Sequence, residues 1–298
     1  MARRLRESLD ESSPHPHVLL RRTRATLPVL LSAPHGGGDK HYFPTPSLPH
    51  SLARMKPRIP GGKGVSLKAD LHTLPLLASL DKHIHDMCGH HCYLVAATLH
   101  RKFVDTNRDI SVEEDNAHHS LTPSLSKEYY DAYHSSVKSC LEDIRLRHPH
   151  TSHVLLLDIH GQATYEDMVV LGTQNRKTCV SKCVSKCVSK DNECIVDMPL
   201  QGFIWHLQSL LGQASLPHPG REDISPYKGG HIVGKYGSQS CDLDHRREMD
   251  ETHVLQGLQG LQVSAVQLEF GSALRSDSVL RCKQIGSCFC LYSCMFYV

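Results

Sequence analysis

Short apolar runs alternate along the chain with stretches in which apolar residues recur at helical spacing. The runs predict buried strands at residues 27–33, 93–97, 154–159, 168–171 and 263–270. The helical spacing predicts helices over residues 71–87 and 126–147, and residues 195–211 suit a third. Strands that alternate with helices indicate an α/β fold around a largely parallel or mixed sheet.

The segments on either side of this pattern do not share it. Residues 1–26 are polar and irregular and are predicted to be a disordered N-terminal tail. Residues 27–275 form the predicted domain, and residues 276–298 form an atypical C-terminal tail that is partly apolar without helical periodicity. Within the domain, residues 178–194 include three tandem copies of Cys-Val-Ser-Lys and are interpreted as a low-complexity surface insertion.

The charge balance argues against a polyanionic partner. The 298 residues carry a formal net charge of +2, so neither nucleic acid nor an anionic membrane is expected to bind. No apolar run reaches the roughly 18 residues that a membrane-spanning helix needs. The basic first residues lack the apolar core of a secretory signal, so we expect a reducing, cytoplasmic location in which the 12 cysteines remain thiols.

Polar residues at the ends of two predicted strands give the first indication of chemistry. Side chains alternate between the faces of a strand, so Asp158 and His160 point the same way at the end of an otherwise apolar run. Gln267 and Glu269 do the same near the end of the last strand. A buried carboxylate needs a cationic or metal partner, and ligand sites of α/β sheets form at the carboxyl ends of strands.

A histidine also follows the first predicted strand. His35 is succeeded by three glycines, Gly36 to Gly38, which allow backbone and ligand to approach it closely. By itself this pattern is typical of an ordinary loop. Together, His35, His160 and carboxylates at other strand ends could form a catalytic zinc site, which needs about three nitrogen or oxygen ligands and an open position.

Six short motifs in order resemble those of the N-formylglutamate amidohydrolase family. They are Leu-Ser-Ala-Pro-His-Gly-Gly at 31–37, Asp-Leu-His-Thr at 70–73, Phe-Val-Asp-Thr-Asn-Arg at 103–108, Leu-Asp-Ile-His-Gly at 157–161, Tyr-Lys-Gly-Gly-His-Ile at 227–232 followed by Tyr-Gly at 236–237, and Val-Gln-Leu-Glu at 266–269. The resemblance covers about residues 27–275. It implies a three-layer α/β/α sandwich around a mixed sheet, similar to the zinc carboxypeptidases.

The resemblance implies a single metal ion per chain, expected to be Zn²⁺ although another divalent metal would serve. His35 and His160 would bind it, with Asp70 as the preferred third ligand. Asp39 and His41 are rival third ligands. Asp158 would orient a metal ligand through a hydrogen bond.

The remaining roles implied by the resemblance concern the substrate, a small N-acyl amino acid. Glu269 would be the general base that activates water. Arg108, beside Asn107, would bind the substrate carboxylate through a bidentate pair, and Arg275 would hold a second carboxylate or the oxyanion.

The implied reaction is hydrolysis of an N-acyl amino acid, such as N-formylglutamate to formate and glutamate. Gly161 replaces the serine that usually follows the metal-binding histidine of the family, so the substrate need not be inherited. Two other hypotheses remain open. The chain could be an inactive relative that binds a metal or a carboxylate, or a histidine- and cysteine-rich protein that buffers metal ions.

Overall fold

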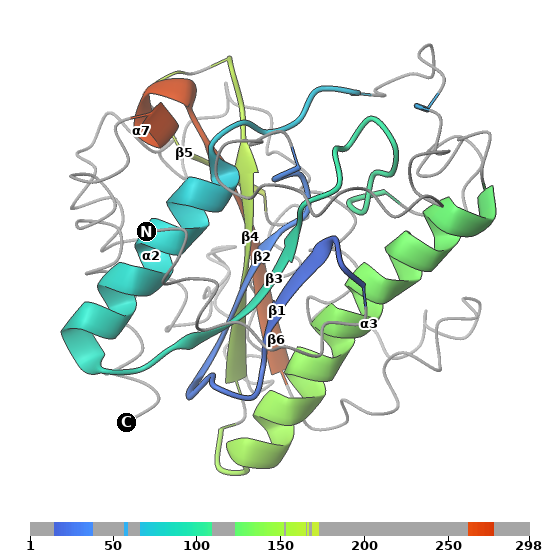
Figure 1. Ribbon diagram of the computed structural model, residues 1–298. Coiled ribbons are helices and arrows are strands. Elements are labelled where there is room, and N and C mark those ends of the chain that lie inside the picture. Colours follow the sequence, from blue (N-terminus) through green and yellow to red (C-terminus); the bar gives the residue numbers. More distant parts are fainter. Residues whose placement is uncertain are drawn as a thin grey trace, which may run out of the picture.

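The computed structural model describes residues 15–37, 57–58, 66–108, 123–151, 153–164, 166, 169–172 and 262–276. Their core is a mixed six-stranded sheet in the order β1-β3-β2-β4-β6-β5 (Figure 1). The strands are β1 Val18–Arg21, β2 Leu27–Ala33, β3 Cys92–Ala97, β4 His153–Gly161, β5 Val169–Gly172 and β6 Gln262–Phe270. The four central strands are parallel, and the edge strands β1 and β5 are antiparallel to their neighbours.

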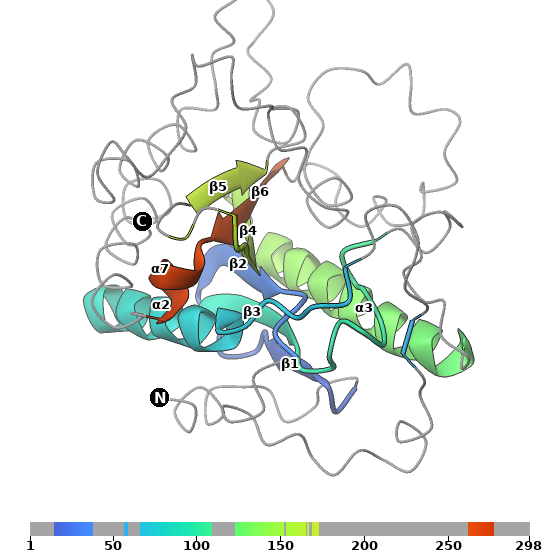
Figure 2. The same cartoon turned by 90° about the horizontal axis from the view of Figure 1, so that it is seen from above.

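Helices cover both faces of this sheet, so the chain is an α/β/α sandwich as expected. Figures 1 and 2 show α2 (Thr73–Cys88) and the short α7 (Ser272–Ser276) on one face and α3 (Pro123–Arg147) on the other. Two separate apolar clusters fill the spaces between the layers. Successive side chains of a strand point to opposite faces of the sheet and therefore enter different clusters. Leu155 and Leu157 of β4 face α2, whereas Leu156 faces α3.

The five strands and two of the helices predicted from the sequence are confirmed to within a few residues. Central parallel strands are covered on both faces, and they therefore read as continuous apolar runs instead of alternating ones. All seven residues of β2 are buried, for example. The helix α2 ends at Gly89, whose left-handed backbone (φ 75°) allows its N–H to donate to the His85 carbonyl.

One strand was not predicted. Residues 1–26 were expected to be disordered, and this is wrong for Val18–Arg21, which form the edge strand β1. The segment was mistaken for a polar tail because it is short and ends in Arg21. That side chain is fully buried, and an ion pair with Asp81 of α2 compensates its charge.

Several other predictions lie outside the described residues. They concern the insertion at 178–194, the helix at 195–211 and the tail at 276–298, apart from Ser276 itself. Of the helices that the structure describes, none is long and apolar enough to cross a membrane. None of the described cysteines, Cys88, Cys92 and Cys140, forms a disulfide. The cytoplasmic location stays a prediction.

Candidate metal centre

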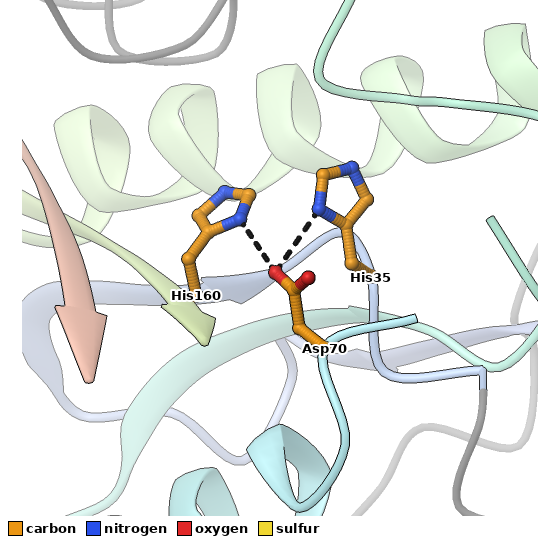
Figure 3. A group of neighbouring side chains, drawn as sticks. All are labelled: His35, Asp70 and His160. Carbon is orange, nitrogen blue, oxygen red and sulfur yellow. Dashed lines mark hydrogen bonds and ion pairs between the residues drawn. The ribbon is translucent and has the colours of Figure 1, made fainter. Parts of the chain in front are cut away.

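Three buried side chains from three separate segments meet at the carboxyl edge of the sheet. His35 follows β2, His160 lies near the end of β4, and Asp70 lies just before α2. One potential ligand atom from each lies within 4.8 Å of the other two. Figure 3 shows both imidazole rings directed at the same carboxylate oxygen of Asp70.

The strand register brings the two histidines together. β2 and β4 are parallel neighbours with Ser32 opposite Asp158, so both chains reach the same edge. Beyond this pair, the ring centroids of His35 and His160 lie 4.7 Å apart, and the two ring planes make an angle of 77°. The hydroxyl of Ser32 donates to Asp158 (2.6 Å), which connects the two strands directly below the site.

The backbone on both sides fixes Asp70. Its N–H donates to the carbonyl of His35 (3.2 Å), and its own carbonyl accepts from the hydroxyl of Thr73 (2.8 Å), the first residue of α2. The turn between them requires a left-handed backbone at His72 (φ 67°). The N–H of Gly161 then donates to Oδ2 of Asp70 (3.2 Å), so the carboxylate is connected to β4 as well as to β2.

Each histidine has a second carboxylate on its other ring nitrogen. Nε2 of His35 lies 2.7 Å from Asp105, and Nε2 of His160 lies 2.9 Å from Asp158. Ionised carboxylates only accept hydrogen bonds, so both ring nitrogens of each histidine face acceptors here. With the ring hydrogen on Nε2, as in carboxylate–histidine–metal triads, Nδ1 of each ring would be the atom available to a metal beside Asp70.

This donor set fits a divalent cation. Nδ1 of His160 and Nδ1 of His35 lie 2.9 Å and 3.2 Å from Oδ2 of Asp70. With metal–ligand bonds near 2.1 Å, the edge of a tetrahedral zinc site measures about 3.4 Å, so the group is close to the required spacing. With Nδ1 of both rings unprotonated, these two nitrogens and the carboxylate oxygen could hold a cation between them, and two imidazoles with one carboxylate suit zinc.

The ionisation of the group also reflects this need for positive charge. Burial alone would lower the pKa of His160, but the charge of Asp158 and hydrogen bonds with Asp158 and Asp70 raise it well above its usual value. Burial alone would raise the pKa of Asp70, but His35 and His160 hold it well below its usual range. The protein surroundings therefore keep the carboxylate charged and favour a cation beside it.

Asp105 is the point to which three arginines converge. Its carboxylate accepts from Nε of Arg101 at 2.8 Å, while Nη1 of Arg58 and Nε of Arg108 lie 3.6 Å and 3.8 Å away. Burial would raise its pKa, but His35 and the arginines lower it far below the usual value. It also accepts from the backbone N–H of Asn107 (3.1 Å), so Asp105 helps to hold this loop in place.

The structure brings Asn107 and Glu269 to the same centre. The amide nitrogen of Asn107 lies 3.1 Å from Nε2 of His160. Because that ring nitrogen already donates to Asp158, we expect the amide to present its oxygen there. Glu269 is directly opposite His160 in the β4–β6 register, is half-buried, and accepts a hydrogen bond from the Gln267 amide (2.7 Å).

Arg275 makes different contacts from those expected of a substrate ligand. Its guanidinium is buried and donates to the backbone carbonyls of Leu71 and Gln162, the latter at 3.1 Å. The rival metal ligands Asp39 and His41 lie outside the described residues. They therefore remain alternatives in the sequence, while Asp70 is the carboxylate found between the two histidines.

One residue of the site, Arg101, was missed in the sequence. It lies two residues before the Phe-Val-Asp-Thr-Asn-Arg motif at 103–108 and belongs to none of the six motifs. Its Nη1 lies 3.8 Å from Oδ1 of Asp70, and the charges of Asp105, Asp70 and Glu269 raise its pKa. Only its Nε forms a hydrogen bond to a described residue, so both terminal nitrogens retain donors. No pattern in the sequence signalled this pairing, because residues 101–105 form a turn and not a helix, so their spacing of four does not by itself bring the side chains together.

Comparison of the chain with protein-family models and with curated proteins finds no match. Among solved structures, N-formylglutamate amidohydrolase from Ralstonia eutropha JMP134 is similar over 95% of this chain and 99% of that chain, with 13% identity and a TM-score of 0.53. Succinylglutamate desuccinylase from Chromobacterium violaceum is 10% identical over 97% of this chain and 72% of that chain, with a TM-score of 0.38. The chain thus has the zinc-carboxypeptidase-like fold of N-formylglutamate amidohydrolase, with a buried His-Asp-His group that could hold a metal ion.

Proposed function

We propose that the chain is a metal-dependent amidohydrolase that cleaves N-acyl amino acids, with N-formylglutamate as the first substrate to test. One observation carries the proposal: two histidines, each held by a carboxylate on Nε2, direct Nδ1 at one oxygen of Asp70. The similarity of fold to an N-formylglutamate amidohydrolase supports the choice of substrate. His35, Asp70 and His160 would hold one Zn²⁺ or another divalent metal.

The bound metal would polarise the amide carbonyl and lower the pKa of water toward about 7. Asp105 and Asp158 keep the two imidazoles in the tautomer that leaves Nδ1 available. They also prevent the rings from rotating, because each carboxylate is itself held by another group, Arg101 or Ser32.

Glu269 is the general base of the proposed reaction. It lies beside His160 on the same face of neighbouring strands, and its carboxylate is close enough to Arg101 and His160 for its charge to act on both. It takes a proton from the attacking water and returns it to the nitrogen of the leaving amine. The Gln267 amide donates to Oε1 of Glu269 (2.7 Å) and so orients the carboxylate.

Arginines would recognise the anionic part of the substrate. The side chain of Arg108 is about a quarter exposed, and Arg108 follows Asn107, whose side chain contacts His160. Arg101 has terminal donors that form no hydrogen bond to a described residue. A carboxylate or a developing oxyanion matches the fork of donors that a guanidinium presents.

The test combines metal content with formate release from N-formyl-L-glutamate, for the wild type and for Glu269→Gln. We expect one metal per chain in both proteins and a loss of about 10²- to 10⁴-fold in kcat for the variant. The matched control is Glu142→Gln, on α3, which should keep the wild-type rate.

Three results would change the proposal. A wild type without tightly bound metal would overturn it. A metal protein that releases no formate but hydrolyses another N-acyl amino acid would change the substrate and keep the reaction. Full activity in Glu269→Gln would remove that residue from the mechanism.

A further inference from the structure

The guanidinium of Arg275 bridges the two segments that carry Asp70 and His160. Its Nη1 donates to the carbonyl of Leu71, the residue after Asp70. Its Nη2 donates to the carbonyl of Gln162 (3.1 Å), two residues after His160. The side chain comes from α7, so a third segment joins the other two at the metal centre.

The guanidinium of Arg275 packs against the backbone of Gly161. A Cβ atom at position 161 would lie 2.1 Å from Nη1 and 2.4 Å from Cζ of Arg275, far inside any real contact. The N–H of the same glycine donates to Oδ2 of Asp70 (3.2 Å), the oxygen that faces both histidines. Gly161 therefore contacts Arg275 on one side and the metal-binding carboxylate on the other, and a side chain at position 161 would displace the guanidinium of Arg275 from its present place.

We propose that Arg275 is a positioning residue for the metal centre, and that Gly161 is the glycine its guanidinium requires. The inference rests on the proposed function, because it concerns the same metal site. Arg275 fixes the spacing between the turn of Asp70 and the end of β4, and thereby the distance from the Asp70 carboxylate to Nδ1 of His160. It replaces the interpretation of Arg275 as a substrate ligand, since its terminal nitrogens donate to backbone carbonyls.

Metal affinity and substrate affinity separate the two interpretations. A positioning residue controls how well three ligand atoms fit one cation, so its loss weakens metal binding and distorts the coordination. A substrate ligand would instead change KM and leave metal binding as it was. Outer contacts of metal ligands typically change metal affinity by about ten- to a hundredfold.

The experiment measures the Zn²⁺ dissociation constant by chelator competition, and the visible spectrum of the Co²⁺-substituted protein, for Arg275→Ala and Arg275→Lys. We expect a ten- to hundredfold weaker affinity and an altered Co²⁺ spectrum in both, since a lysine cannot reach two carbonyls at once. KM, measured with saturating metal, should stay within about twofold of the wild type. Gly161→Ser should reproduce the loss of affinity, and combining it with Arg275→Ala should add little.

Arg147→Ala is the matched control. Arg147 also ties a helix to backbone carbonyls, those of Thr23 and Ala25, but on the surface at the end of α3. It should leave both the dissociation constant and the spectrum unchanged.

Each outcome decides between the two proposals. If the wild type binds the metal tightly, and Arg275→Lys matches it in affinity and spectrum but raises KM, Arg275 is a substrate ligand and the inference is wrong. If the wild type binds no metal, the proposed function and this inference both fall. If Arg275→Ala does not fold, the lysine and Gly161→Ser variants still decide.

Discussion

Two groups of buried charged side chains in this chain differ in how their charges are compensated. Arg21 of β1 and Asp81 of α2 form a closed pair: both guanidinium Nη atoms donate to the carboxylate, and Nε donates to the carbonyl of Cys92. At the carboxyl edge of the sheet, by contrast, Asp70 faces two imidazole nitrogens that are themselves acceptors when the histidines are neutral.

The difference indicates which group serves stability and which serves function. A buried ion pair whose donors and acceptors match needs nothing from outside the protein. A carboxylate that faces Nδ1 of two histidines is completed either by protons on the rings or by a bound cation, and the surrounding carboxylates, Asp105 and Asp158, increase the demand for positive charge. We therefore expect changes in the first group to alter unfolding and changes in the second to alter metal binding and hydrolysis.

The largest effect is expected from His160→Ala, which removes a ligand. Metal content should fall to near zero, and formate release should drop by at least about a thousandfold, because the metal lowers the pKa of water by many units. Metal analysis and a formate assay check this. The matched control is His91→Ala, a histidine with Nδ1 3.6 Å from Asp81 in the other group, which should keep one metal per chain. If His91→Ala also lost its metal, the Arg21–Asp81 group and the metal centre would not be independent of each other.

Asp81→Asn should have the next largest effect, on stability alone. The change leaves the guanidinium of Arg21 buried without a matching charge, which costs about 3–5 kcal/mol. Urea unfolding of the metal-loaded protein measures this cost, and metal stoichiometry at low urea should remain that of the wild type. The double variant Arg21→Met/Asp81→Leu should be less destabilised, since it buries no lone charge. A single variant as stable as the wild type would show that the pair contributes nothing.

Arg101→Leu should have a smaller effect, confined to the second group. Loss of the terminal donors should lower kcat/KM by about ten- to a hundredfold, which corresponds to about 1.4–2.7 kcal/mol of transition-state binding. Metal content should persist, because the three ligands are retained. Steady-state kinetics with N-formyl-L-glutamate provide the measurement, and Arg145→Leu on α3 is the surface control. If the kinetics were unchanged, Arg101 would not contact the substrate, and its only role would be to hold Asp105 in place.

The central strands of the sheet could be predicted because a strand that is buried on both faces is a continuous apolar run in the sequence. β2 matches its predicted bounds, and the same-face placement of Asp158 and His160 followed from strand alternation. β1 could not be recognised in this way, because four residues ending in Arg21 look polar until Asp81 is in place. Its partner lies 60 positions away in sequence, which no local pattern reveals.

The metal centre was predicted through resemblance more than through residue patterns. Nothing in the spacing of His35, Asp70 and His160 says that they meet, since that depends on which strands are neighbours. Arg275 shows the limit of both routes: the resemblance implied a role at a substrate carboxylate or the oxyanion, and the hydrogen bonds of its guanidinium to the carbonyls of Leu71 and Gln162 could not be predicted from the sequence. Only the folded chain shows that Gly161 has no room for a Cβ atom beneath it.

The smallest expected effect is a pH dependence that belongs to the first group. Burial alone would raise the pKa of Asp81, but His91 and the charge and hydrogen bonds of Arg21 hold it below its usual value. When a folded-state carboxyl pKa is lowered, the unfolded chain takes up protons first as the pH falls. The stabilisation is therefore complete above the ordinary carboxyl pKa of about 3.9 and is lost as the pH falls through the lower folded-state pKa.

The free energy of unfolding of the wild type, relative to that of Asp81→Asn, should accordingly stay constant between about pH 7 and pH 5 and shrink below about pH 4. Urea titrations at several pH values measure it. Asp131→Asn, an exposed change on α3, should show no comparable trend. If the difference persisted unchanged below pH 4, the stabilisation by Asp81 would come from the shape and hydrogen bonding of its side chain. In that case the charge of Asp81 would not stabilise the fold, and only the results for the metal centre could support the comparison of the two groups.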